Sequence, residues 1–178
     1  MPETNAILLR DGIAGDFQAI ADLHVASWQQ TYRSLMPDTY LSGPVFEDLR
    51  KRWHAQLMDP PKDSILIVAE DETAIAGFIY LYPDEDEMGW VTLDNLHVRA
   101  DFRGRGLGER LMKAAAARIT ELGRARVLLY VLDGNDDACR FYERLGGVPD
   151  PIEGHTIAGF ENLPSIPYRW HDFSKVTG

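Results

Sequence analysis

Three apolar runs, separated by two short polar turns, constrain the fold of this chain more than any other feature. The runs cover residues 64–70, 73–82 and 90–98. They are rich in the β-branched and aromatic residues that favour strands. Asp71 and Glu72 form the first turn, and Pro83 with the acidic stretch 84–87 forms the second. Because turns this short join antiparallel neighbours, the pattern predicts a three-stranded meander.

Helical patterns lie on both sides of this meander. Apolar residues recur at helical spacing in three stretches, and a shorter helix is expected to end at a pair of glycines; the four ranges are 14–34, 45–58, 106–122 and 135–145. Further strands are expected near residues 7–9, 126–132 and 168–170. This order predicts an α/β fold, a mixed sheet with helices on its faces. We expect a single domain over residues 1–178, because no linker or repeat divides the chain.

Composition excludes several classes of function. The formal net charge is −10, and so acidic a surface repels nucleic acid, so we expect no nucleic-acid partner. No run of 18 apolar residues is present, and the N-terminus lacks the pattern of a secretory signal. The single cysteine, Cys139, cannot form an internal disulfide. We therefore expect a cytoplasmic protein without a membrane partner, and we expect no metal because no cluster has ligand spacing.

The sequence RGRGLG, residues 103–108, lies between a predicted strand and a predicted helix. The first N–H groups of a helix have no intrahelical partner and carry the positive end of the helix dipole, which suits them to an anion. Glycine also lets a ligand approach the backbone closely. The stretch matches neither a P-loop nor a dinucleotide fingerprint. It predicts a diphosphate site with Arg103 adding charge, and the alternative is a flexible turn with solvated arginines.

The stretch LHVRADFRGRGLGERLM resembles the acetyl-CoA motif of the GCN5-related N-acetyltransferases, R/Q-x-x-G-x-G/A, filled here by Arg103, Gly106 and Gly108. A second family pattern, N-x-x-A-x-x-x-Y-x-x-x-G, is similar to DGNDDACRFYERLGG, with matching positions at Asn135, Ala138, Tyr142 and Gly146. The segment HVASWQQTYRSLMPDTYL also resembles the first helices of many small bacterial members. The resemblance covers roughly residues 7–148.

This resemblance implies a mostly antiparallel sheet that splays open between its fourth and fifth strands and binds acetyl-CoA there as co-substrate. Backbone groups of Leu96 and Val98, with His97 between them, would pair with the pantetheine arm as an added strand does. Asn135 would bond the pantetheine or adenine side of the coenzyme. The pyrophosphate would lie on the N–H groups of Gly104, Arg105, Gly106, Leu107 and Gly108.

The family resemblance also implies where the acceptor binds. The first helix commonly walls the acceptor pocket, which makes Trp28 and Tyr32 candidate substrate contacts, although core packing is the alternative for both. Family members are often dimeric, so a homodimer is an expectation.

Acetyl transfer to an amine requires an acid and a base. An amine with a pKa near 10.4 must lose a proton before it attacks, and the leaving thiolate benefits from gaining one. Tyr142 is the expected acid, because it lies two helical turns from Asn135 and the family often uses this tyrosine; a merely packed tyrosine is the alternative.

The base is less defined by the sequence. Thr92 occupies the position where the histone-acetylating branch of the family carries a glutamate. Asp94 lies two residues further on the same strand face, from which it would act through water, and a structural role is the alternative. His97 is the second candidate.

These residues favour an N-acetyltransferase that moves the acetyl group from acetyl-CoA directly to a primary amine of a small molecule. One alternative is a non-catalytic coenzyme A-binding module. Another is an enzyme that acts on a protein or peptide amine, which predicts an open groove rather than a closed pocket. The acidic composition mildly favours cationic acceptors such as polyamines, aminoglycosides or amino-acid amines.

Overall fold

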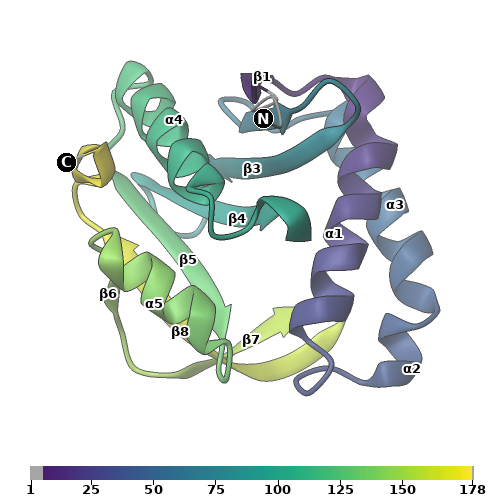
Figure 1. Ribbon diagram of the computed structural model, residues 1–178. Helices are drawn as coiled ribbons and strands as arrows, with labels where there is room; N and C mark the ends of the chain where they lie inside the picture. Colours follow the sequence, from purple (N-terminus) through teal and green to yellow (C-terminus); the bar gives the residue numbers. More distant parts are fainter. Residues whose placement is uncertain (1–5, 178) are drawn as a thin grey trace.

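The computed structural model describes residues 6–177. A twisted sheet runs through the middle of the molecule, and helices cover both of its faces (Figure 1). Its strands are β1 (Leu8–Asp11), β2 (Ile65–Glu70), β3 (Ile75–Pro83), β4 (Trp90–Val98), β5 (Arg126–Leu132), β6 (Val148–Pro149), β7 (Glu153–Ile157) and β8 (Phe160–Trp170). Their order across the sheet is β1-β2-β3-β4-β5-β8-β6, and β7 pairs with β8 beside this path. The helices are α1 (Phe17–Thr31), α2 (Asp38–Leu41), α3 (Pro44–Met58), α4 (Leu107–Glu121) and α5 (Asp136–Arg144).

The predicted antiparallel meander is confirmed as β2, β3 and β4. Its first turn is tight because the Asp71 carboxylate accepts the backbone N–H groups of Thr73 and Ala74. The pairing of β3 with β4 has one irregularity, where Tyr80 faces Asn95 but the next residue, Leu81, faces Leu93. Asp94 is therefore the extra residue of a β-bulge.

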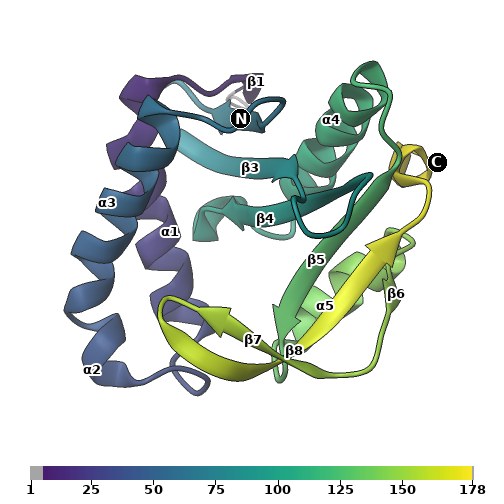
Figure 2. The ribbon, with the colours of Figure 1, turned by 180° about the vertical axis from the view of Figure 1, so that it is seen from behind.

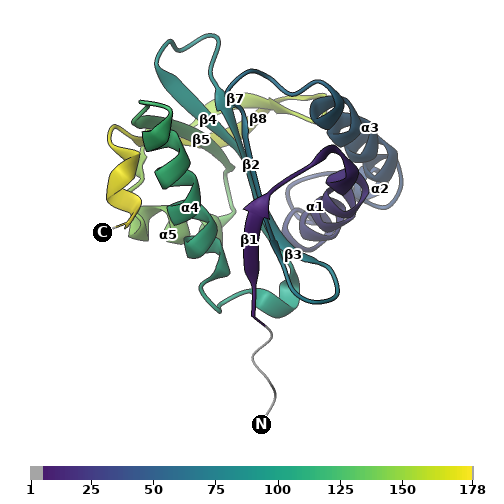
Figure 3. The ribbon, with the colours of Figure 1, turned by 90° about the horizontal axis from the view of Figure 1, so that it is seen from above.

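Two apolar cores hold the helices to the sheet, one on each face. Figure 3 shows α1, α2 and α3 on one side of the sheet and α4 and α5 on the other. On one face α1 and α3 bury Ile20, Val45 and Trp53, which have no exposed surface. On the other face α4 buries Leu111 and Met112 just as completely, and α5 packs beside it. The mixed sheet with helices on both faces is thus confirmed.

The first helix is shorter than predicted, because a 3-10 turn at Ala14–Asp16 precedes α1 and α1 ends at Thr31 instead of reaching residue 34. The C-terminal region differs more. A last strand was expected only near residues 168–170, whereas β8 spans Phe160–Trp170 and forms a hairpin with β7.

The prolines of β8 explain why the sequence pattern missed this hairpin. Proline lacks a backbone N–H and argues against a strand. Here Pro164 and Pro167 take part through their carbonyl groups, which accept the N–H groups of Asp133 and Asp150. The turn of the hairpin, Ala158–Gly159, has positive φ at both residues (52° and 80°), as a type I′ hairpin turn requires.

This hairpin extends away from the rest of β8 toward α1 and α2 (Figure 2). The rings of Phe160 and Tyr40, from the hairpin and α2, meet edge to face with centroids 5.1 Å apart. Ile157 and Leu163 pack against the same core as α1 and α3. The hairpin therefore joins the C-terminal half of the molecule to the N-terminal helices. Among residues 6–177, no helix combines the length and apolarity that crossing a membrane demands.

Candidate active site

The sheet opens between β4 and β5. These parallel strands pair only where Trp90–Thr92 faces Arg126–Leu128. Beyond that point β4 remains paired with β3 and β5 with β8, so within the described residues no strand pairing joins the facing edges. A cavity of about 1480 Å³ extends from this opening, with residues of β4, β5, α1 and the N-terminal ends of α4 and α5 in its lining. This opening lies where the splay was expected.

The glycine stretch forms one end of the cavity. Gly104 and Gly106 have positive φ (71° and 78°), and a Cβ added at either would meet nothing within 4 Å. The α4 ladder begins with Arg110 donating to the Gly106 carbonyl, which leaves the N–H groups of the first turn without intrahelical partners. Gly108 packs on α5, where a Cβ would lie 3.3 Å from the Phe141 ring. Open space and unused donors fit an anion.

The two arginines of this stretch behave differently. Arg103 borders the cavity, where its Nε donates to the Val98 carbonyl at 3.1 Å and its terminal nitrogen lies 3.4 Å from the Ser27 hydroxyl. The Arg105 guanidinium lies over the Phe102 ring, 5.0 Å from its centroid. Arg105 is absent from the cavity lining, so a phosphate contact by its side chain finds no support, and the role of its backbone N–H stays a prediction.

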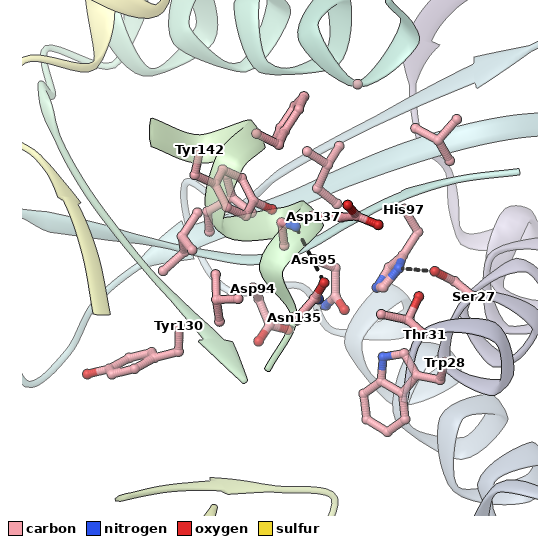
Figure 4. Close-up of a pocket in the computed structure, with 18 of the residues that line it drawn as sticks. Ser27, Trp28, Thr31, Asp94, Asn95, His97, Tyr130, Asn135, Asp137 and Tyr142 are labelled. Atoms are coloured by element: carbon pink, nitrogen blue, oxygen red, sulfur yellow. Dashed lines mark hydrogen bonds between the residues drawn. The ribbon is translucent and has the colours of Figure 1, made fainter. Parts of the chain in front are cut away.

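Helix α5 presents Asn135 and Tyr142 to the cavity (Figure 4). Asn135 is the N-cap of the helix, and its side-chain oxygen accepts the N–H of Ala138 at 3.4 Å. The Tyr142 ring packs edge to face on Trp170, so the packed role considered for it is also fulfilled.

Burial keeps two phenols at the cavity protonated. It raises the pKa of Tyr142 well above its usual value, with the neighbouring Tyr32 adding to the shift. Burial likewise raises the pKa of Tyr32 to about 12, against the opposing effect of a hydrogen bond with Asn135. Both hydroxyls therefore carry their protons at neutral pH, which is the state that a general acid needs.

Asp94 and Thr92 both line the cavity, on the side of β4 that faces α3. At the bulge, the Oδ2 atom of Asp94 accepts hydrogen bonds from Arg52 and from the side-chain amide of Asn95. Thr92 is buried, and its hydroxyl donates to Asp84 at 2.6 Å. This hydrogen bond holds the carboxylate of Asp84, from the turn after β3, beside Thr92. In the resemblance described above, the histone-acetylating branch carries a glutamate at the position of Thr92.

His97, the second candidate base, points toward α1. Its Nδ1 lies 2.8 Å from the Ser27 hydroxyl, and its ring centroid lies 4.4 Å from that of the buried His24 (Figure 4). Burial, and then the positive charges of Arg103 and Arg52, lower the pKa of His97 to about 3. An imidazole so reluctant to hold a proton is a poor base toward an amine.

The candidate acceptor residues Trp28 and Tyr32 both line the cavity, with ring centroids 5.6 Å apart. Trp28 is also buried in the core, so packing and cavity lining go together at this position. Whether either touches a substrate stays a prediction.

Sequence reasoning missed several residues that line the cavity, among them Arg52, Asp84, Tyr130 and His155. Asp84 was expected only as part of the turn at residues 84–87, and the ring of His155 stacks on that of Tyr130 with centroids 4.0 Å apart. The local sequence does not signal the places of Arg52 and His155, because their partners, Asp94 and Tyr130, are distant along the chain. Within residues 6–177, no three His, Cys, Asp or Glu side chains gather as metal ligands would.

Comparisons with known proteins decide the family. The model of the acetyltransferase (GNAT) family matches residues 19–147. The chain belongs to this family. The expectation drawn from the two sequence motifs is thereby confirmed.

Individual relatives agree with this assignment. The uncharacterized N-acetyltransferase YuaI of Bacillus subtilis is 21% identical over 96% of both chains. The mycothiol acetyltransferase of Corynebacterium aurimucosum is 39% identical over 58% of this chain but only 36% of its own length. Among solved structures, the PaiA N-acetyltransferase of Thermoplasma acidophilum in complex with coenzyme A superposes with a TM-score of 0.73 at 17% identity, covering 91% of this chain and 98% of the other. This last likeness concerns the fold.

Proposed function

We propose that this family member transfers the acetyl group of acetyl-CoA directly to the primary amine of a small molecule. One observation carries the proposal: the opening between β4 and β5 brings the α4 N-terminus and the protonated Tyr142 to a single cavity. The donor-binding and proton-donating parts that the reaction needs therefore lie around one space.

The donor end of the cavity fits a coenzyme A diphosphate. The unused N–H groups at the start of α4 and the positive end of its dipole favour the anion, and Arg103 adds a charge beside them. The unpaired edge of β4 offers the backbone of Leu96 and Val98 to an extended amide chain. The Val98 carbonyl is engaged by Arg103, so we expect that contact to exchange when pantetheine binds.

We assign each step of the chemistry to a group of this chain. Acetyl-CoA supplies the acetyl group as a thioester, and the amine nitrogen forms the new C–N bond as the C–S bond breaks. Asp94 takes the amine proton through a water molecule, using the carboxylate oxygen that Arg52 and Asn95 leave free. Tyr142 gives its proton to the departing sulfur. Backbone N–H groups beside the β4 bulge polarise the carbonyl oxygen.

The β7–β8 hairpin favours a small acceptor over a protein. Residues 155–158 of the hairpin line the cavity, and the hairpin packs on α2 through Phe160 and Tyr40. The hairpin therefore closes one side of the cavity, where an open groove would be needed to hold an extended peptide. The mycothiol acetyltransferase among the relatives is named for a small-molecule acceptor, which agrees with this preference.

Release of coenzyme A in the presence of a broad panel of amines tests the proposal. We expect release that requires both acetyl-CoA and an amine. Tight binding of acetyl-CoA without release for any acceptor would instead favour a non-catalytic binding module.

Two substitutions test the assigned roles. Tyr142→Phe should lower kcat by about 10²- to 10⁴-fold, the usual contribution of a general acid, with acetyl-CoA binding retained. Tyr168→Phe is the matched control, because this hydroxyl bonds Glu143 in the same core and does not line the cavity. Asp94→Asn should lower kcat by at least about 10-fold. An unchanged kcat in either cavity variant would remove that residue from the mechanism.

A further inference from the structure

Arg52 is a charged residue of the cavity to which the proposed reaction assigns no step. It projects from α3 toward β4, where it pairs with Asp94. A guanidinium carries five N–H donors in a rigid fork. Within residues 6–177, Arg52 donates a single hydrogen bond, to Asp94, and 36% of its side chain is exposed. Most of its donors therefore remain available to a molecule in the cavity.

Two carboxylates at this end, those of Asp84 and Asp94, are largely engaged by hydrogen bonds, whereas Asp86, which also lines the cavity, is exposed. Asp84 accepts the backbone N–H groups of Asp86 and Glu87 through one oxygen and the Thr92 hydroxyl through the other. Asp94 accepts two hydrogen bonds at Oδ2, which leaves Oδ1. Directly beside the Arg52 guanidinium, the acceptor that remains for a substrate is thus the Oδ1 atom of Asp94.

From this pairing we infer that the acceptor is an amino acid, with a carboxylate close to an amino group. The inference rests on the proposed function and narrows its substrate class. A substrate carboxylate on Arg52 gains charge-assisted, potentially bidentate hydrogen bonds, and a neighbouring amino group reaches the free oxygen of Asp94 through the water molecule that carries its proton. Two opposite charges on the substrate then face two opposite charges on the protein.

The same arrangement disfavours an acceptor that carries only positive charge. A polyamine drawn to Asp94 would bring an ammonium group next to the Arg52 guanidinium, and like charges in contact oppose binding. The acidic composition of the whole chain favours cations in general, whereas this local pair selects a zwitterion.

Amines that differ only in the carboxylate test the inference. The pairs are phenylalanine with phenethylamine, lysine with cadaverine, and ornithine with putrescine, each assayed for coenzyme A release. For at least one pair, we expect the amino acid to have a kcat/KM about 10- to 100-fold above that of its decarboxylated partner, the range for a hydrogen bond to a charged group. Arg52→Ala should bring that ratio close to one, and Arg52→Lys should leave an intermediate ratio.

The ratio of kcat/KM between the two amines of a pair shows whether Arg52 selects the substrate carboxylate or has only a structural role. Arg50→Ala, an exposed position on the same helix, is the control and should keep the wild-type ratio. If Arg52→Ala lowered kcat/KM equally for both amines of a pair, Arg52 would only hold Asp94 in place and the inference would be wrong. Acetylation of the decarboxylated amines at equal or higher kcat/KM would also overturn it while leaving the proposed function intact. Absence of turnover with every acceptor would overturn the proposed function, and the inference with it.

Discussion

The two ends of the cavity are built in different ways. The donor end consists largely of backbone: the edge of β4 and the N–H groups that follow two glycines with positive φ. The acceptor end consists of side chains from α1, α3, β4, β5 and β7, which meet only in the folded chain. A backbone site is specified by a short run of residues, whereas a side-chain site depends on the whole topology.

This difference indicates how many substitutions each end of the cavity tolerates. Substitution of an acceptor residue changes one contact and leaves the sheet in place. The glycine stretch tolerates less, because its donors are usable only in a left-handed conformation that other residues adopt at a cost. One family can thus keep a common donor while its acceptors differ.

The largest effect on coenzyme A affinity is expected from Gly106→Ala, which tests the backbone character of the donor end. A left-handed alanine costs about 1–2 kcal/mol, and relief of that strain would turn the N–H groups away from the cavity. Because about 1.4 kcal/mol corresponds to a tenfold change in affinity, we expect coenzyme A to bind at least about 10-fold more weakly by calorimetry.

Gly123→Ala is the matched control at the other end of α4. Gly123 has nearly the same φ (69° against 78°), and an added Cβ again meets nothing within 4 Å. It should therefore lower stability to a similar extent while coenzyme A affinity stays at the wild-type value. Equal losses of affinity in the two variants would mean that backbone strain acts through general stability and not through the anion site.

The glycine turn and the start of α4 at the proposed donor end could be predicted from the sequence because their determinants are local. The glycines between strand and helix, and the spacing of Asn135 and Tyr142, are visible without a fold. The meander was equally readable from short turns and strand composition. In each case the residues that make the structure lie within about one element of each other.

The acceptor end could not be predicted, for the opposite reason. Arg52 meets Asp94 across 42 positions, and His155 stacks on Tyr130 only because the C-terminal hairpin folds back. That hairpin was itself hidden by Pro164 and Pro167, which join the sheet through carbonyl groups alone. The bulge that makes Asp94 the extra residue of β4 also appears only in the register with β3.

His97 is influenced by a charged residue from each end of the cavity. Its contribution to the free energy of unfolding should therefore depend on pH. Arg103 from the donor end and Arg52 from the acceptor end both help burial to lower its pKa to about 3. Between pH 3 and about 6.5 the unfolded chain therefore binds a proton that the folded chain excludes. Stability should fall as the pH falls through this window, by up to about 1.4 kcal/mol per pH unit from His97, with buried His24 acting in the same direction.

Urea unfolding at pH 7, 6 and 5 measures this slope. His97→Gln should make the loss of stability on acidification shallower by up to about 1.4 kcal/mol per pH unit. His171→Gln, at an exposed position, serves as the control and should keep the wild-type slope. If the free energy of unfolding of His97→Gln changed with pH as it does in the wild type, the imidazole would be protonated in the folded protein. Arg103 and Arg52 would then not keep His97 uncharged.

The smallest effect concerns Asn135, the donor-end residue that acts through its side chain. Asn135→Ala removes the N-cap of α5 and should lower the free energy of unfolding by about 1 kcal/mol. Asn135→Ser keeps a capping oxygen and should restore most of this loss, but it lacks the amide that would reach the coenzyme. If Asn135 bonds coenzyme A, both variants should bind it about 2- to 10-fold more weakly, although only the alanine variant is less stable. Wild-type affinity in Asn135→Ser would restrict Asn135 to capping α5, and would leave the donor end built from backbone and Arg103 alone.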